Sequence, residues 1–164
     1  MERHSGLAAW GLRESTLEND ETGCRLLLTE SVLPARVEKI FVVDTGSGAT
    51  VAALKAATRW ADQLDFRIEL IVPQIVPYPL APETPATSVE FIRARIRQLA
   101  AAVPVSNVLV CLCRDPFQAL TEILPSRSVV VIGSRKRLLV LASSHRLARK
   151  LRRRGHSVIE VISR

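Results

Sequence analysis

The sequence predicts an α/β fold with a mostly parallel sheet that is covered by helices on both faces. Five short apolar runs alternate with segments of helical periodicity, as in chains built from βα units. No long antiparallel meander interrupts this alternation, which favours parallel strands. With 164 residues, 48% of them hydrophobic, the chain is long enough for one domain with a sizeable core. The expected strands are 39–43, 67–72, 107–112, 128–132 and 157–162.

The first half of the pattern contains two strands and two helices. The run KIFVV (39–43) ends at the turn sequence DTGSG, and residues 49–64 then carry apolar side chains at helical spacing. A Thr or Ser cap is expected before this helix. The strand RIELIV (67–72) precedes a stretch with five prolines, 73–86, which predicts an ordered loop. The sequence TSVE that follows has capping-box spacing and opens the second helix.

The second half repeats the scheme with three strands and two helices. After NVLVCL, Asp115 offers an N-cap and Pro116 a first helical residue for a short helix. After SVVVI, a turn at Gly133 leads toward a last helix that Ser143 or Ser144 can cap. The apolar run SVIEVI then forms the fifth strand.

Residues 1–37 do not fit this alternation. We interpret them as an N-terminal extension to a domain at 38–164. Their segment CRLLLTESVL is compatible with either a helix or a strand. We expect the extension to be partly disordered, or to pack its apolar residues on the domain or on a second subunit.

Several broad classes of protein are disfavoured by composition. No apolar run approaches the roughly 20 residues of a transmembrane helix, and the N-terminus lacks the features of a signal peptide. Three cysteines do not indicate a disulfide framework, and Cys111 and Cys113 lack further ligands at metal-binding spacing. We therefore expect a cytoplasmic protein without a metal site.

The net charge of +7 is concentrated at one end of the chain. Residues 126–164 contain eleven Lys and Arg residues against a single Glu, whereas the preceding residues are slightly acidic overall. Such asymmetry is a reason to consider an anionic partner.

Four features of the order and spacing resemble one known family. They are a strand that ends in aspartate (FVVD) before TGSGAT, the proline-rich loop, CRDPFQALTEIL after the third strand, and VVVIGSRKR before a serine-capped helix. From about Lys39 to Ile162, the chain is similar to the universal stress protein family. The resemblance implies a Rossmann-like, five-stranded parallel sheet in the order 3-2-1-4-5, a regulatory role in stress response, frequent homodimers and, in many members, an ATP site.

A ligand site is expected between the first and fourth strands, because ligands bind where the strand order of such a sheet reverses. There, Asp44 can accept ribose hydroxyls, and Gly133 can let backbone amides approach phosphates near a helix N-terminus. The resemblance adds Val72 as an adenine contact and Ser143 as a phosphate contact. The candidate nucleotide-binding residues are Asp44, Thr45, Val72, Gly133, Ser134 and Ser143.

The phosphate loop departs from the pattern of ATP-binding members. Lys136 and Ala142 stand where those members have glycine, and the connection is four residues shorter. A Cβ at these positions keeps backbone amides away from phosphate oxygens. The four apolar residues 138–141 suggest that the pocket is partly filled and that ATP binds weakly or not at all. The alternative is an ATP-responsive switch in which Arg135, Lys136 and Arg137 replace the glycines.

The basic last helix has two interpretations. Cations in the last turn stabilise a helix against its macrodipole. The excess of cations also suits an acidic protein, the phosphates of a nucleic acid or an anionic membrane surface. The candidate anion-binding residues are Arg135, Lys136, Arg137, Arg149, Lys150, Arg152, Arg153 and Arg154.

No set of catalytic residues is visible, because the three histidines are isolated in sequence from any nucleophile or carboxylate partner. Residues and resemblance together predict a non-enzymatic regulatory or interaction module with lost or weakened ATP binding, for which no cofactor is expected. The fifth strand is apolar and poorly protected, and in similar proteins this strand pairs with its counterpart, so we expect a homodimer.

Overall fold

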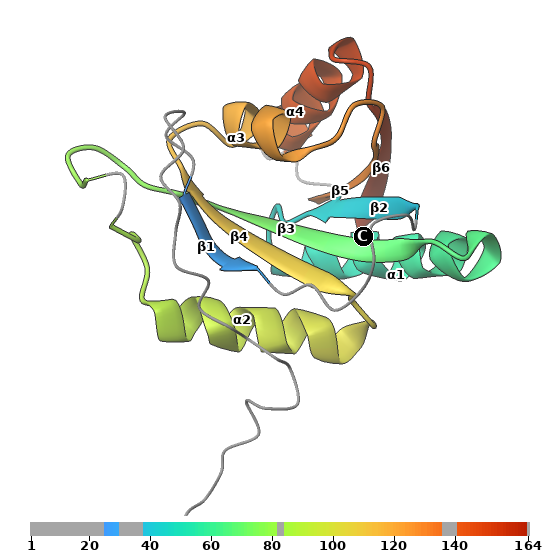
Figure 1. Cartoon of the computed structure of the whole chain (residues 1–164), viewed down its shortest axis with the longest axis horizontal. Helices are drawn as coiled ribbons and strands as arrows, with labels where there is room; N and C mark the ends of the chain where they lie inside the picture. The colour runs from blue at the N-terminus through green and yellow to red at the C-terminus, as the bar shows by residue number, and fades with distance from the viewer. Residues whose placement is uncertain (1–24, 30–37, 82–83, 136–140, 164) are drawn as a thin grey trace, which may run out of the picture.

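The computed structural model describes residues 25–29, 38–81, 84–135 and 141–163. They form a six-stranded sheet in the order β1-β4-β3-β2-β5-β6, with four helices (Figure 1). The strands are β1 (Arg25–Thr29), β2 (Lys39–Val43), β3 (Arg67–Ile75), β4 (Asn107–Cys113), β5 (Val129–Arg135) and β6 (Ser157–Ser163). The helices are α1 (Ser47–Leu64), α2 (Val89–Ala102), α3 (Pro116–Ile123) and α4 (Leu141–Arg153).

The five predicted strands form the parallel part of this sheet. β2 is central and pairs in parallel with both β3 and β5, while β4 lies beyond β3 and β6 lies beyond β5. If the five predicted strands are numbered 1 to 5 along the chain, this is the order 3-2-1-4-5. The predicted fold class is therefore confirmed.

A sixth strand comes from the stretch that we interpreted as an N-terminal extension. Strand β1 pairs antiparallel with β4, from Arg25 opposite Leu112 to Thr29 opposite Leu109, with a register shift between Leu26 and Leu28. The extension thus covers the β4 edge of the sheet. The rest of it, residues 1–24 and 30–37, lies outside the described residues.

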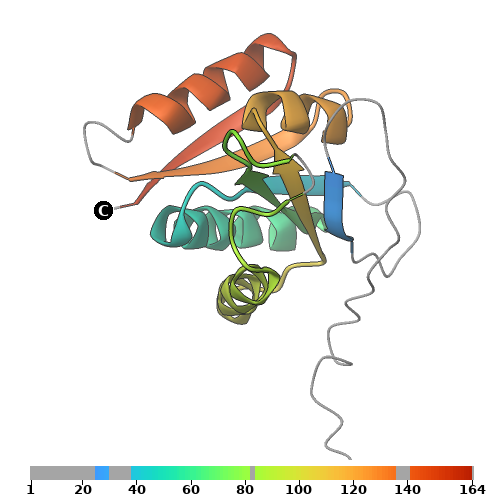
Figure 2. The same ribbon diagram turned by 90° about the vertical axis from the view of Figure 1, so that its left-hand side faces the viewer.

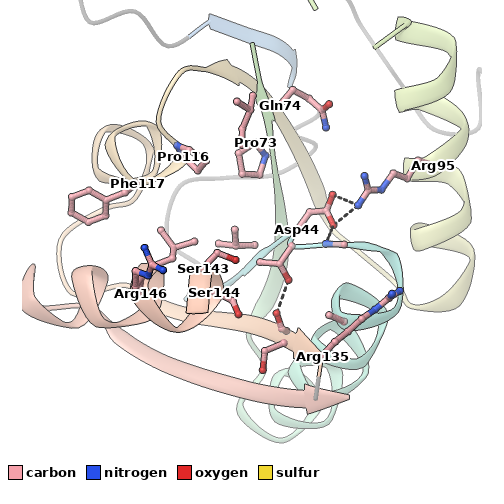
Figure 3. Close-up of a pocket in the computed structure, with 18 of the residues that line it drawn as sticks. Asp44, Pro73, Gln74, Arg95, Pro116, Phe117, Arg135, Ser143, Ser144 and Arg146 are labelled. Carbon is pink, nitrogen blue, oxygen red and sulfur yellow. Dashed lines mark hydrogen bonds and ion pairs between the residues drawn. The ribbon is translucent and has the colours of Figure 1, made fainter. Parts of the chain in front are cut away.

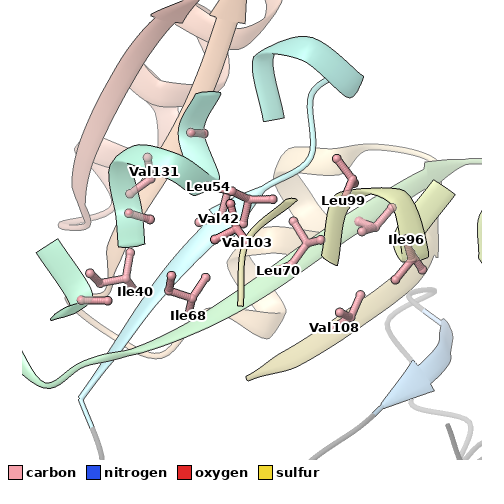
Figure 4. Close-up of a cluster of buried hydrophobic side chains, with 14 of the residues drawn as sticks. Ile40, Val42, Leu54, Ile68, Leu70, Ile96, Leu99, Val103, Val108 and Val131 are labelled. Atoms are coloured by element: carbon pink, nitrogen blue, oxygen red, sulfur yellow. The ribbon is translucent and has the colours of Figure 1, made fainter. Parts of the chain in front are cut away.

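The helices cover both faces of the sheet, α1 and α2 on one face and α3 and α4 on the other (Figure 2). On the first face, Leu54 of α1 and Ile96 of α2 pack on strand residues such as Val42 and Leu70 (Figure 4). On the second face, Leu120 of α3 and Leu151 of α4 complete a separate apolar cluster. Each of the five parallel strands therefore contributes side chains to both cores.

Local capping explains where α2 and α3 begin. The Ser88 hydroxyl accepts the N–H of Phe91 at 3.2 Å, and the Asp115 carboxylate accepts the N–H of Phe117 at 2.8 Å. For α1 the expected Thr or Ser cap is wrong: its N-cap is Gly46, which makes no side-chain capping bond. A φ of 134° at this residue requires glycine.

Two strands run further than predicted, which corrects the turns expected after them. β3 continues through Pro73 to Ile75, where its residues still pair with β4. On the other side of β3, strand β2 ends at Val43, opposite Ile71. The nitrogen of Pro73, which carries no hydrogen, faces the side beyond the end of β2, so no hydrogen bond to a neighbouring strand is lost. β5 continues to Arg135 because its last three residues, Gly133 to Arg135, pair with β6. Gly133 is therefore a strand residue and not the first residue of a turn.

The last helix also differs from its prediction. Helix α4 begins at Leu141, so Ser143 and Ser144 lie in its first turn instead of capping it. No helix among the described residues combines the length and the apolar character needed to cross a membrane.

Candidate functional site

A cleft of about 1140 Å³ opens at the carboxyl ends of β2, β3 and β5, where the strand order reverses (Figure 3). Its lining comes from the β2–α1 connection, the end of β3, one side of α2, the start of α3, the end of β5 and the start of α4. This is the place at which open α/β sheets bind ligands.

One side of the cleft, which we call the aspartate wall, consists of Asp44, Thr45, Gly46 and Arg95. The Asp44 side chain is 5% exposed, and Nη2 of Arg95 lies 2.8 Å from its Oδ1 and 2.7 Å from its Oδ2. The N–H of Gly46 donates to Asp44 at 3.1 Å, and the hydroxyl of Thr50 lies 2.5 Å from the same oxygen. The carboxylate therefore has its charge balanced and its hydrogen bonds made within the protein.

Thr45 and Gly133 join this wall to strand β5. The Thr45 hydroxyl donates to the carbonyl oxygen of Gly133 at 2.5 Å, and the Thr45 N–H donates to the Thr50 hydroxyl at 3.1 Å. A Cβ at Gly133 would collide with the backbone carbonyl of Ala49 in α1. The glycine is therefore needed for the close approach of α1 to β5.

The opposite side of the cleft, which we call the serine wall, consists of Ser134, Ser143, Ser144 and Arg146. Ser134 is 3% exposed and Ser144 is 6% exposed, and neither hydroxyl has a hydrogen-bond partner among the described residues. Ser143 and Arg146 are exposed in the first turns of α4 (Figure 3). Buried polar groups are normally hydrogen-bonded, so two unpartnered hydroxyls at one cleft require an explanation.

The cleft carries an excess of positive charge. Among the described residues, four cations line it, Arg95, Arg135, Arg146 and Lys150, against the two carboxylates of Asp44 and Asp115. Both carboxylates are engaged, Asp44 by Arg95 and Asp115 by the cap of α3. Arg135 extends toward the start of α1, where a Cβ on Gly48 would lie 3.0 Å from its Nη2. Nζ of Lys150 lies 4.9 Å from the ring centroid of Phe117, a cation–π contact.

Apolar surface is also accessible in this cleft. Phe91 of α2 is 60% exposed and Ile75 at the end of β3 is 56% exposed, and both line it together with Pro73 and Pro116. Convergent polar groups beside apolar and aromatic surface are typical of small-molecule sites.

The structure brings most of the candidate nucleotide-binding residues together. Asp44, Thr45, Gly133, Ser134 and Ser143 all line the one cleft.

Val72, the expected adenine contact, is not among the lining residues. It is 1% exposed in the core, because β3 does not end there but continues for three more residues. Pro73, Gln74 and Ile75 line the cleft in its place.

The candidate anion-binding residues divide into groups. Arg135 and Lys150 line the cleft. Arg152 donates to Glu160 at 2.7 Å and to the carbonyl of Val158 at 2.9 Å. The other residues of α4 and its end, Arg149, Arg153 and Arg154, are exposed outside the cleft, and Lys136 and Arg137 lie outside the described residues.

We expected the pocket between Asp44 and Gly133 to be partly filled by apolar side chains. The described residues do not fill it, and the cleft that they line is open. Of the four apolar residues to which we assigned that filling, 138–140 lie outside the described part of the chain, as does the side chain of Leu141.

Sequence reasoning missed Arg95, Phe91 and Phe117. Arg95 belongs to α2 and Asp44 follows β2, 51 residues away, so no local motif connects them. The one available signal was the position of Arg95 beside the apolar stripe of its helix, next to Ile92 and Ile96.

The described lining residues include neither histidine nor cysteine, so they form no serine–histidine or cysteine–histidine pair. His145 instead lies 3.1 Å from Glu160, and burial lowers the pKa of His156 in the turn before β6. Within the described part of the chain, no three acidic, His or Cys side chains gather as metal ligands. The described lining thus combines cations and unpartnered hydroxyls with apolar surface, which are the groups that suit an anion with an apolar portion.

No protein-family model matches the chain, and no curated protein matches it.

Proposed function

We propose that this protein is a non-enzymatic regulatory module of the universal stress type, acting in the cytoplasm, that binds a small organic anion and binds ATP only weakly. The observation that carries the proposal is the pair of unpartnered hydroxyls, Ser134 and Ser144, in an open cleft with an excess of cations. No catalytic step is proposed.

The serine wall supports binding of the anionic group. Ser143 and Ser144 lie in the first turn of α4, a 13-residue helix whose N-terminal N–H groups and dipole favour negative charge. Arg146 and Lys150 add two full charges within the next two turns of the same helix. A phosphate or carboxylate at this position would also supply acceptors for the hydroxyls that lack a partner.

The aromatic and apolar groups support binding of an organic portion next to the charge. Phe91 of α2 and Ile75 at the end of β3 expose apolar surface and line the cleft. Burial of this surface by a ligand would be favourable by about 25 cal/mol per Å² of apolar area.

Two observations support weak binding of ATP in the manner of the family. Asp44, the expected ribose ligand, is buried and paired with Arg95, so a ribose hydroxyl would have to displace existing bonds. The backbone around Gly133 pairs with β6, and the carbonyl oxygen of Gly133 accepts the Thr45 hydroxyl. This backbone therefore does not form a phosphate-binding turn.

Calorimetric titration with AMP, ADP, Mg-ATP and inorganic phosphate tests the proposal. We expect phosphate or AMP to bind at millimolar concentration, and Arg146→Glu to remove this binding. Arg149→Glu is the matched control, because Arg149 lies one turn along α4 but does not line the cleft. Binding of Mg-ATP in the low micromolar range, abolished by Asp44→Ala, would replace the proposal with the ATP-responsive alternative.

We also propose that two copies associate through β6. This strand is an edge of the sheet, with Ile162 60% exposed and Val158, Ile159 and Val161 partly buried, and an unprotected apolar edge favours pairing with a second strand. Sedimentation should show a dimer that Ile162→Lys dissociates. A wild-type monomer at high micromolar concentration would refute the association.

A further inference from the structure

The outward face of α4 carries a row of arginines, of which only Arg146 lines the cleft. Arg146, Arg149 and Arg153 follow one another at intervals of three and four residues, which places them on one face of the helix. Arg154 continues the row immediately after the helix end. The opposite face of α4 is fixed in the core by Ala148 and Leu151, which are fully buried.

These four residues, the arginine row, differ from the other cations of α4. Arg152 has its charge balanced by Glu160, and Lys150 lies over the ring of Phe117. The side chains of Arg149, Arg153 and Arg154 form no ion pair with any described residue and are exposed. The macrodipole of one helix interacts favourably with cations only in its last turn, so it does not account for the whole row.

We propose that the arginine row binds the phosphate backbone of a nucleic acid. A helix rises about 1.5 Å per residue, so the row extends over roughly 10 Å, enough for two or three successive phosphates of one strand. Guanidinium groups match phosphate oxygens in a bidentate geometry, which favours arginine at such contacts.

The surroundings of the row favour a nucleic acid over a protein or a membrane. Protein interfaces centre on apolar or aromatic anchors, but none of the large apolar side chains exposed by the described residues lies on α4. Helices that bind membranes insert their apolar face, whereas the apolar face of α4 packs on the sheet. The row contains no aromatic side chain and is proposed to contact phosphates, so we expect binding that is electrostatic and indifferent to sequence.

Fluorescence anisotropy with a short labelled duplex of mixed sequence, titrated between about 50 and about 200 mM salt, tests the proposal. With two or three phosphates neutralised, the logarithm of the affinity should fall against the logarithm of the salt concentration with a slope of about −2 to −3. Arg149→Glu combined with Arg153→Glu should weaken binding at least about tenfold at the lowest salt and flatten the slope by about two. Neither residue lines the cleft, so small-anion binding should remain.

The matched control is Lys55→Glu combined with Arg59→Glu, an equal change of charge at two exposed positions of α1, on the other face of the sheet. An equal loss of affinity in this control would overturn the proposal, because total charge and not the arginine row would then be responsible. Absence of duplex binding at the lowest salt would also overturn it, as would tighter binding of polyglutamate than of the duplex. If the Glu variant fails to fold, as judged by its melting temperature, Arg149→Gln with Arg153→Gln serves with the same expected direction.

Discussion

The two walls of the cleft differ in how their polar groups are used. On the aspartate wall, the Asp44 carboxylate is paired with Arg95 and accepts further hydrogen bonds, and the Thr45 hydroxyl donates to Gly133. On the serine wall, two buried hydroxyls have no partner among the described residues. The carboxylate and the Thr45 hydroxyl on one side of the cleft thus have partners within the protein, although Nε of Arg95 has none among the described residues, whereas the two buried hydroxyls on the other side have no partner.

This difference indicates which side is suited to a ligand. A group that already has a partner must lose one hydrogen bond before it gains another, whereas an unpartnered buried group gains a bond outright. We therefore expect the aspartate wall to contribute to the stability of the fold, and the proposed anion to bind at the serine wall.

The largest expected effect comes from Gly133, where the two walls meet. Gly133→Ala should lower the free energy of unfolding by about 3 kcal/mol, because the added Cβ meets the rigid backbone of Ala49. The melting temperature Tm should fall by about 6–12 °C. Gly48→Ala is the control: its Cβ would meet only the flexible end of Arg135, so unchanged or slightly higher stability is expected. Equal losses in both variants would contradict the packing role of Gly133.

A smaller loss is expected when the aspartate wall is broken. Arg95→Ala should destabilise the fold by about 2 kcal/mol in urea unfolding, because it leaves the 5% exposed Asp44 carboxylate without its counter-charge. Arg97→Ala, on an exposed position of the same helix, should change stability by less than about 0.5 kcal/mol. If the losses of unfolding free energy for Asp44→Asn and Arg95→Ala were strictly additive in a double-mutant cycle, the ion pair between them would not contribute to stability.

On the serine wall, the corresponding truncation should be harmless. Ser144→Ala removes a buried hydroxyl without a partner and should leave stability unchanged or raise it by up to about 1 kcal/mol. Ser128→Ala should cost about 1 kcal/mol, because that buried hydroxyl donates to the carbonyl of Pro125 at 2.6 Å. Chemical denaturation of both variants measures the contrast. A loss for Ser144→Ala as large as for Ser128→Ala would mean that the Ser144 hydroxyl does have a hydrogen-bond partner in the folded protein.

The smallest effect concerns Glu160 of β6, which interacts with His145 and Arg152 of α4. Burial alone would raise the pKa of Glu160, but hydrogen bonds from Arg152 and His145 outweigh this, and the pKa lies below its usual value of 4.5. A lowered pKa contributes stability above about 4.5 that is lost as the pH falls through the folded value. Glu160→Gln should therefore lose about 0.5–1 kcal/mol at pH 7 in urea unfolding. The difference from wild type should vanish in acid, and a difference that grows there would contradict this sign.

The regular elements were predictable from local patterns. The apolar runs of the five parallel strands and the helical periodicity of 49–64 are properties of neighbouring residues, and the caps of α2 and α3 lie within three residues of the groups they bind. Strand order came from resemblance, and the sheet has that order. By contrast, the segment RLLLT is too short to distinguish helix from strand, and its state depends on the open edge of β4.

The sequence by itself determined the fold class, the edge of the sheet at which a site belongs and the concentration of positive charge at one end of the chain. Only the tertiary structure decided how far β3 and β5 extend, because a strand continues as long as its neighbour offers hydrogen bonds. It also decided that Arg95 neutralises Asp44 and that Gly133 serves the packing of α1. These contacts join residues 51 and 84 or more positions apart in the chain, and no local pattern in a sequence encodes which distant groups the fold brings within hydrogen-bonding distance.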